Sequence, residues 1–550
     1  MKKIVISSVL FLGLVSAGLV GCQKGSLLSN PNAASTSSTV PVSLIFNRLV
    51  NEIYYGGGVM DAVGINSNSS SGPAQNEGPW SEVHRWNQFY VSLYSYYWGS
   101  NTYNWSNTAT MYSVLKYVNL MEQQIPAQFG TTANPYSALA YFFKAYQFIW
   151  YTQRVGDIPM DQAGVSTIST PTYNLQHDVY QNCLALLDTA NTLMAALVAS
   201  PTGGPTATVT GDIYGLTYLQ WQKVINTYKL RVLISLSRRA QDNPDLNIPT
   251  QFANIINNPT QYPIMAGITD NLEFKYNSVY NKYPIAPNYT PYDFYESMCD
   301  TYLNITTANQ DPRTFIAATP APAQITGGKS VSDFTAYVGA DINLGQSALL
   351  VNATNGMYSY ANYLRYFADP TGATEEPAII IGYPEMCFNI AEAANLGWIS
   401  GSLASTWYTN GIMGSMAMYG LKDGTVIPIG DNKGHSLGSV TASVSTFLAN
   451  SNVVYTGNNP TGLNQILTQK YVAFWQNSGW EAYYNWRRTG VPTMGQGGAG
   501  IGTTSNNNMI PVRWEYPEDE QVANTANWQS AVNSQFGGTD AINSAMWLTK

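Results

Sequence analysis

Residues 136–159, YSALAYFFKAYQFIWYTQRVGDIP, form the stretch that decides the fold of this 550-residue chain. Apolar side chains recur in it at the spacing of a helix and form two stripes. One stripe consists of Tyr141, Ala145, Phe148 and Ile149, and the other of Leu139, Phe142, Phe143, Tyr146 and Trp150. A helix that is apolar nearly all round packs against neighbours on more than one side. The stretch therefore predicts the central helix of a stacked helical array.

This helix is a poor candidate for a membrane span. A span needs about 20 consecutive apolar residues, whereas Tyr and Trp rings and the cations Lys144 and Arg154 interrupt this run. Its end is also defined by the sequence. Gly156 is expected to provide a left-handed stop, and Pro159 cannot continue a helix.

Motifs at six places share a pattern with one protein family. They are Gly156-Asp157-Ile158-Pro159, WQKVINTYKLR at 221–231, Asp311-Pro312-Arg313, YPEMCFNIAEAANLG at 383–397, ILTQKYVAFWQNSGWEAYYNWRRTGVP at 466–492, and Arg513 to Asn524. In this order they resemble the signatures of the SusD/RagB family, nutrient-binding outer-membrane lipoproteins of the Bacteroidetes type. The resemblance covers most of residues 41–530.

The resemblance implies a mainly α fold. In that fold, a SusD-like scaffold of tetratricopeptide-type helical hairpins carries long irregular loops that hold ligand, with minor β structure. It also implies a SusC-like TonB-dependent transporter as partner, with this protein as a lid over the pore. The helices expected beside the central one are 41–55, 81–97, 108–124, 175–198, the segment around 221–231, 383–397 and 404–419. Residues 242–380 are expected to hold loops, short helices and a small hairpin.

The amino terminus looks like a lipoprotein signal. Met1-Lys2-Lys3 precede an apolar run too short for a stable span, and Leu19-Val20-Gly21-Cys22 looks like a lipobox. Residues 1–21 are thus predicted to be a signal peptide, Cys22 the lipidated residue, 22–40 a flexible tether and 41–550 a single ligand-binding domain. The predicted location is the outer membrane, facing the cell surface. The alternative is an ordinary secretory peptide with a chance cysteine.

The amino-acid composition limits the classes of molecule that the protein is expected to bind. The net charge is −8 and only 11% of residues are charged. The 25 cations form no basic stripe, which argues against nucleic acid. The 39 tyrosines outnumber all Lys and Arg together, and tyrosine suits surfaces that bind neutral polar ligands. Cys183, Cys299 and Cys387 have no zinc spacing, and Cys183 and Cys387 are expected to be buried in helices.

Several motifs suggest enzyme chemistry only superficially. Residues 434–438, GHSLG, fit a nucleophile elbow, but no histidine follows Ser436 to complete a triad. Residues 495–500, GQGGAG, fit G-x-G-x-x-G without a preceding strand. His84 and His177 lack metal-ligand spacing. The carboxylate cluster is expected to be a solvated segment paired with arginine, with Arg487, Arg488 and Arg513 as scaffold residues. It consists of Glu515, Glu518, Asp519 and Glu520.

Loop aromatics are the candidate ligand site. A flat ring stacks on the C–H face of a sugar, and Asn or Gln reads its hydroxyls. Two segments, 80–105 and 281–295, combine these residue types in loops. The candidate site residues are Trp80, Trp98, Asn101, Tyr103, Asn104, Trp105, Tyr283, Tyr289, Tyr292 and Tyr295. Trp86, Phe89 and Tyr90 are expected to belong to the core.

These observations predict a non-catalytic lipoprotein that binds oligosaccharide and passes it to the transporter. The sequence leaves three alternatives open. The first is a peptide-binding member of the same family, the second a lipid-anchored glycoside hydrolase, and the third a structural lipoprotein without a ligand. No cofactor is predicted, and a structural Ca²⁺ in a loop remains open.

Overall fold

The computed structural model describes residues 39–55, 86–93, 112–279, 283, 296–368, 376–401, 403–501 and 506–550. The predicted signal peptide, Cys22 and nearly all of the tether lie outside these ranges, so the predicted domain limits stay a prediction. In the described residues, no helix combines the length and the apolar character that crossing a membrane requires. One cluster of buried apolar side chains extends from Val42 to Leu548.

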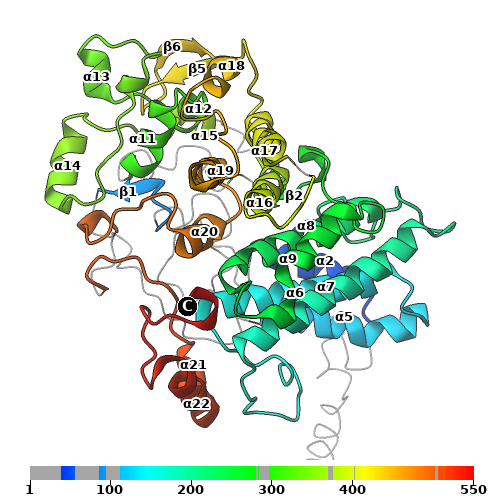
Figure 1. The fold of residues 1–550 in the computed structure, drawn as a ribbon. Helices are drawn as coiled ribbons and strands as arrows, with labels where there is room; N and C mark the ends of the chain where they lie inside the picture. Colours follow the sequence, from blue (N-terminus) through cyan, green and yellow to red (C-terminus); the bar gives the residue numbers. More distant parts are fainter. Residues whose placement is uncertain are drawn as a thin grey trace, which may run out of the picture.

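Helices dominate the described chain, as predicted (Figure 1). The longer ones are α2 (Val42–Tyr55), α5 (Ser113–Phe129), α6 (Pro135–Val155), α7 (Gln176–Val198), α8 (Tyr218–Ser235), α9 (Ile248–Asn257), α16 (Tyr383–Asn395), α17 (Ala404–Met418), α19 (Pro460–Ala473) and α22 (Thr525–Phe536). Shorter α-helices are α11 (Asp300–Ala308), α12 (Arg313–Ala317), α13 (Pro322–Thr326), α14 (Gln346–Thr354), α15 (Tyr363–Tyr366), α18 (Val444–Leu448), α20 (Glu481–Thr489) and α21 (Glu518–Ala523).

Helix α6 is central, as its sequence predicts. The Asn134 side chain caps its first turn by accepting from Ser137 N at 2.9 Å, and Pro135 occupies the first position. All of its residues except Pro135, Tyr141 and Lys144 are buried. Helices α5 and α7 pack against it on two sides, so the all-round apolar character is explained by neighbours rather than by lipid.

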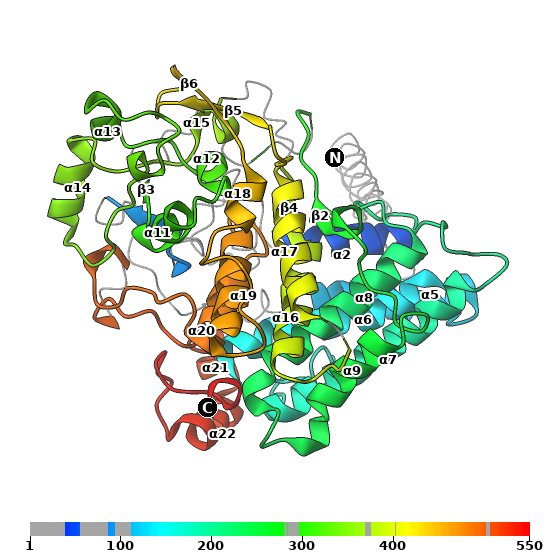
Figure 2. The ribbon, with the colours of Figure 1, turned by 45° about the horizontal axis from the view of Figure 1, so that its top comes forward.

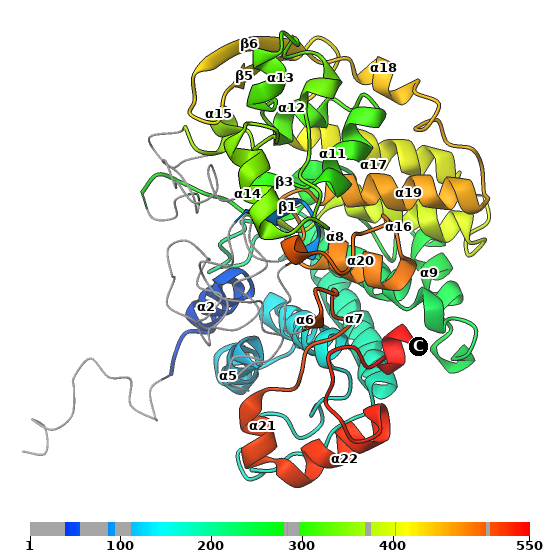
Figure 3. The same cartoon turned by 90° about the vertical axis from the view of Figure 1, so that its left-hand side faces the viewer.

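The helices pack in a continuous array. Helix α2 packs on α5, α5 on α6, α6 on α7 and α7 on α8. Helix α8 then contacts α16, which pairs with α17 and α19 (Figure 2). The predicted hairpin of 383–397 with 404–419 is confirmed by α16 and α17. Figure 3 shows α2 and α5 at the edge of the array, with α21 and α22 below them.

In its described part, the predicted helix at 81–97 holds only at Trp86 and is wrong beyond it. Residues Tyr90–Ser92 form strand β1, which pairs antiparallel with β3 (Glu296–Met298). Trp86, Phe89 and Tyr90 are buried, so their assignment to the core is confirmed. The pairing joins residues about 200 positions apart, and no local pattern can reveal such a partner.

The expected hairpin within 242–380 is also replaced by a long-range pair. Strand β2 (Leu272–Phe274) pairs antiparallel with β4 (Ala378–Ile381). The described hairpin is β5 (Val426–Gly430) with β6 (Ser436–Thr441). Apart from β3, the other described residues of 242–380 form short helices and loops, as expected.

The end of α6 differs in detail from the expected left-handed stop. Gly156 has φ +106° and ψ −132°, a region that only glycine enters at low cost. A Cβ at this position would lie 2.3 Å from Gln535 Oε1 on α22. The same oxygen accepts a 2.8 Å hydrogen bond from Asp157 N. The glycine therefore also admits the carboxyl-terminal segment to the end of the central helix.

Candidate functional site

A cavity of about 320 Å³ lies where four separate segments meet. Its described walls are η5 (Ile268–Asp270) with the β2–β4 ribbon, the end of α17, Tyr283, and the turn after α19. Figure 2 shows β2 and β4 beside α16 and α17. The volume falls at the lower end of the range of about 300–1,000 Å³ that small-molecule sites occupy.

The turn after α19 has an unusual backbone. Gln476 and Ser478 have φ of +57° and +59°, on either side of Asn477. Non-glycine residues rarely adopt this region, and it costs on the order of 1–2 kcal/mol per residue. Ser478 N donates to Ile379 O on β4 at 2.8 Å, and Asn477 N donates to Phe474 O at 3.0 Å. The first bond holds the turn against the ribbon and the second closes the turn itself, so Asn477 is presented to the cavity in a fixed position.

Asn477 is buried, with 7% of its surface exposed, yet only the NH₂ group of its side-chain amide forms hydrogen bonds. Its Nδ2 donates to Trp475 O at 2.9 Å and lies 3.5 Å from the Tyr419 hydroxyl. The Tyr419 hydroxyl itself donates to Trp475 O at 3.2 Å. In the described structure Asn477 Oδ1 accepts no hydrogen bond. A ligand hydroxyl in the cavity would supply the missing donor.

Two carboxylates line the same cavity. Glu376 forms an ion pair with Arg365, and Glu273 lies 3.4 Å from Lys275 Nζ. Burial raises the pKa of the Glu376 carboxyl, although the Arg365 guanidinium opposes the rise. Burial also raises the pKa of Glu273, against the opposing effect of Lys275. Both carboxylates are therefore partly removed from water at the edge of the cavity.

Of the predicted site residues, the structure describes Tyr283 alone. Its ring is buried, lines the cavity and meets Tyr276 edge to face at 5.1 Å. Its predicted ligand contact stays a prediction. The other nine, Trp80, Trp98, Asn101, Tyr103, Asn104, Trp105, Tyr289, Tyr292 and Tyr295, lie outside the described residues.

The sequence analysis missed Asn477, Tyr419, Glu273 and Glu376. One signal was available for Asn477. The run Asn477-Ser478-Gly479 interrupts an otherwise apolar and helical signature with three turn-forming residues. The other three come from segments with no local motif, and only the fold brings them together.

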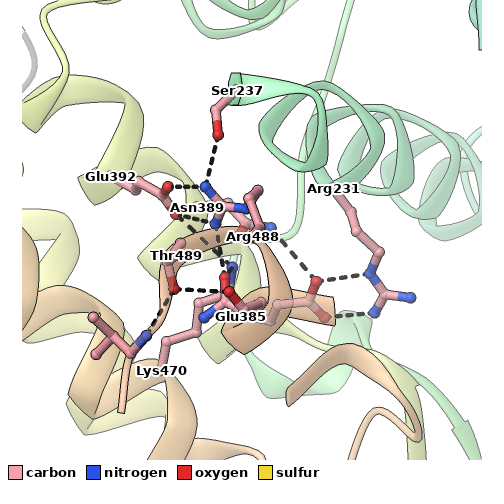
Figure 4. A network of polar contacts seen from close by, with 10 residues as sticks. Arg231, Ser237, Glu385, Asn389, Glu392, Lys470, Arg488 and Thr489 are labelled. Atoms are coloured by element: carbon pink, nitrogen blue, oxygen red, sulfur yellow. Dashed lines mark hydrogen bonds and ion pairs between the residues drawn. The ribbon is translucent and has the colours of Figure 1, made fainter. Parts of the chain in front are cut away.

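The charged residues of the family motifs form an internal network (Figure 4). Glu392 on α16 pairs with Arg488 on α20, and Lys470 Nζ lies 4.0 Å from the same carboxylate. Burial lowers the pKa of Lys470 to about 8, although Glu392 counteracts this. Arg488 also donates to Ser237 Oγ at 2.7 Å. These contacts join three helices, so the predicted scaffold role of Arg488 is confirmed.

Arg487 and Arg513 are likewise structural. Arg487 donates to Val512 O and Gln153 O, both at 2.8 Å. Arg513 pairs with Asp540 at 2.5 Å. Among the described residues none of the three arginines forms an ion pair with the 515–520 cluster, so that part of the expectation is wrong, although the Arg513 guanidinium opposes the rise that burial causes in the pKa of Glu515. Glu520 is buried rather than solvated and accepts from the Tyr173 hydroxyl at 2.6 Å.

The two glycine motifs serve packing and turn formation. Ser436 begins strand β6 of a hairpin, whereas a nucleophile elbow needs a strand followed by a helix. His435 pairs with Asp431 at 2.8 Å in the same hairpin. A Cβ at Gly498 would lie 2.2 Å from Asn343 Cα, so the glycine-rich loop packs directly on a neighbouring backbone. No group of three or more His, Cys, Asp or Glu in the described ranges could hold a metal ion.

Buried cysteines agree with the sequence interpretation. Cys183 on α7 and Cys387 on α16 are fully buried, as is Cys299. Burial raises the pKa of each thiol. They behave as small core side chains.

The arrangement of helices is shared with solved structures. A SusD homologue from Bacteroides fragilis is 25% identical, with 93% of this chain and 100% of that chain covered and a TM-score of 0.76. A second homologue from the same species is 26% identical, with 93% and 99% covered and a TM-score of 0.70. A chitin-binding SusD homologue from Flavobacterium johnsoniae shares the fold at 18% identity, with 92% and 98% covered and a TM-score of 0.65.

No curated protein is similar enough to this chain to count as a match. A family model of SusD-like type, described as "Starch-binding associating with outer membrane", matches residues 43–517. This segment includes all of α2 except Val42, the central helix, the α16–α17 hairpin and the turn that presents Asn477. The chain therefore belongs to the SusD-like family of starch-binding proteins that associate with the outer membrane.

Proposed function

We propose that this protein is a non-catalytic glycan-binding lipoprotein. In this proposal Cys22 carries the lipid that holds it at the outer membrane, and the bound oligosaccharide passes to a SusC-like TonB-dependent transporter. The cavity around Asn477 is the observation that carries the proposal. It combines a free amide oxygen, a tyrosine hydroxyl and tyrosine rings, which together suit the hydroxyls and the C–H face of a sugar.

The predicted loop aromatics would extend this site. Two or three stacked rings at about 1.5–2 kcal/mol each supply roughly 3–6 kcal/mol. That free energy corresponds to a Kd on the order of millimolar to tens of micromolar. Weak binding of this kind favours rapid release, which hand-over to a transporter requires.

Isothermal titration of the purified protein against a panel of oligosaccharides tests the binding proposal. Asn477→Ala and Trp98→Ala are expected to weaken binding of the best glycan at least tenfold. Asn355→Ala is the matched control, because Asn355 is exposed at the end of α14, away from the cavity lining. Binding of peptides but of no oligosaccharide would contradict the proposal, and so would release of new reducing ends from a bound glycan.

The anchor and the partner need separate experiments. Cys22→Ala is expected to move the protein from the membrane fraction to the soluble fraction and to abolish labelling with a radioactive fatty acid. Purification of the native protein under mild detergent is expected to recover a TonB-dependent transporter. Unchanged membrane attachment of the variant, or recovery of the protein alone, would contradict that part of the proposal.

A further inference from the structure

Acceptor groups of three residues line the cavity, beside the hydroxyl, amide and ammonium groups of its other polar residues. Asn477 Oδ1 is an acceptor without a donor, and the carboxylates of Glu273 and Glu376 accept only. The nearest cationic donor in the described lining is Lys275, which is 71% exposed and lies against Glu273. A ligand that fits must therefore bring hydrogen-bond donors of its own.

Charge adds a second restriction. The carboxylate of Glu376 is already neutralised by Arg365, and that of Glu273 by Lys275. A ligand carboxylate or sulfate would enter beside both glutamates and would find no cation that is not already paired in the described lining. Since burial weakens the screening by water there, the repulsion is larger than on an open surface. A ligand cation would in turn have to break one of the two existing ion pairs to gain a partner.

This inference rests on the proposed function and narrows it. We propose that the cavity selects uncharged oligosaccharides, whose hydroxyls donate to Asn477 Oδ1, and rejects uronic-acid and sulfated sugars. Glu273 is the residue that sets this selection, because its carboxylate is held by a lysine side chain that is 71% exposed, whereas the arginine that holds Glu376 is only 27% exposed. Neutral sugars satisfy every acceptor without adding charge.

Six hexameric probes test the proposal by titration at low salt. Maltohexaose, cellohexaose and xylohexaose are neutral, hexagalacturonate and a heparin hexasaccharide are acidic, and a chitosan hexamer is cationic. At least one neutral hexamer is expected to bind at least tenfold more tightly than every charged one. Its affinity is also expected to change less than twofold between 20 and 500 mM NaCl.

A charge-removing variant isolates the role of Glu273. Glu273→Gln keeps the shape of the side chain and is expected to narrow the preference for the neutral hexamer over hexagalacturonate at least threefold. Asp333→Asn is the control, since Asp333, like Glu273, is a half-buried carboxylate, but it does not line the cavity. Thermal unfolding of both variants verifies that they fold.

The outcomes separate this inference from the proposed function. Tighter binding of an acidic or cationic hexamer than of every neutral one would overturn the inference and leave glycan binding intact. An unchanged preference in Glu273→Gln would also overturn it. Binding of none of the six hexamers would contradict the proposed function itself, and the inference with it.

Discussion

The guanidinium of Arg231 on α8 donates two hydrogen bonds to the carboxylate of Glu385 on α16. Nε lies 2.7 Å from Oε1 and Nη2 lies 2.5 Å from Oε2. Both side chains are at least nine-tenths buried, and Glu481 lies 3.8 Å from the same guanidinium. Nη2 also donates to Ile380 O on β4. The pair therefore joins α8 to the α16–α17 hairpin and to the β2–β4 ribbon that borders the cavity.

Removing one partner of this pair is expected to destabilise the fold strongly. Glu385→Gln leaves the Arg231 charge buried without its carboxylate, and breaking such a pair costs about 3–5 kcal/mol. The double variant Arg231→Met, Glu385→Leu is expected to recover much of the loss. Urea denaturation measures both. His435→Ala, which breaks an exposed pair, is the control and is expected to cost less than about 1 kcal/mol. A loss in Glu385→Gln no larger than in His435→Ala would contradict the expectation.

Gly156→Ala tests the junction between α6 and the carboxyl-terminal segment. The new Cβ would lie 2.3 Å from Gln535 Oε1. In addition, the fold requires a backbone conformation at this position that is unfavourable for alanine. We expect a loss of about 2–4 kcal/mol from strain and from the displaced hydrogen bond to Asp157 N. Gly130→Ala is a close control, because its φ is +65° and nothing lies within 4 Å of its added Cβ. It is expected to cost about 1 kcal/mol. Equal losses of stability in the two variants, measured by thermal or urea unfolding, would show that the contact with Gln535 does not contribute to the effect of Gly156→Ala.

Asp157 makes the stability of this junction depend on pH. Burial raises its pKa to about 6, although a 2.7 Å hydrogen bond from Gln176 N opposes the rise. The folded state thus holds the proton more tightly than the unfolded state. This contribution to stability is complete below about pH 4 and is lost as pH rises through about 6.

Asp157→Asn removes that titration and keeps an oxygen that can accept from Gln176 N. The variant is expected to match the wild type near pH 4 and to exceed its stability by up to about 3 kcal/mol above pH 6.5. Urea midpoints measured from pH 4 to 7.5 check this, and other titrating groups cancel in the difference. Parallel curves for the two proteins would contradict the assignment.

The helices could be predicted from the sequence where a long periodic pattern coincided with defined ends. The expected helix 175–198 is Gln176–Val198, and 404–419 is Ala404–Met418. The exception at 81–97 has a physical reason. Aromatic residues occur in both helices and strands, and β1 is a strand because Glu296–Met298 pairs with it. Tertiary pairing decided that segment, and local preference did not.

The site was less accessible to prediction than the fold. Aromatic residues in loops can be recognised from the sequence as a type of ligand-binding residue. A cavity, however, needs residues from several distant segments. Asn477 follows a helix, Glu273 lies on a three-residue strand, and Tyr419 ends a helix more than 140 residues away from Glu273. Only the turn-forming run around Asn477 stands out in the sequence. Their proximity follows from the β2–β4 pairing and from the hydrogen bond between Ser478 N and Ile379 O.

The left-handed turn around Asn477 leads to the last prediction. Ser478 has φ +59° and its backbone N–H is bonded to the ribbon. Glycine tolerates this conformation, whereas the Cβ of alanine makes it unfavourable, as the Cβ of serine does. Ser478→Gly is therefore expected to be more stable than Ser478→Ala by about 1 kcal/mol in urea denaturation, although glycine is the worse residue in most structured positions. The reverse order would mean that Ser478 is not held in the left-handed region. Asn477 would then have no rigid support for presenting its oxygen to a sugar.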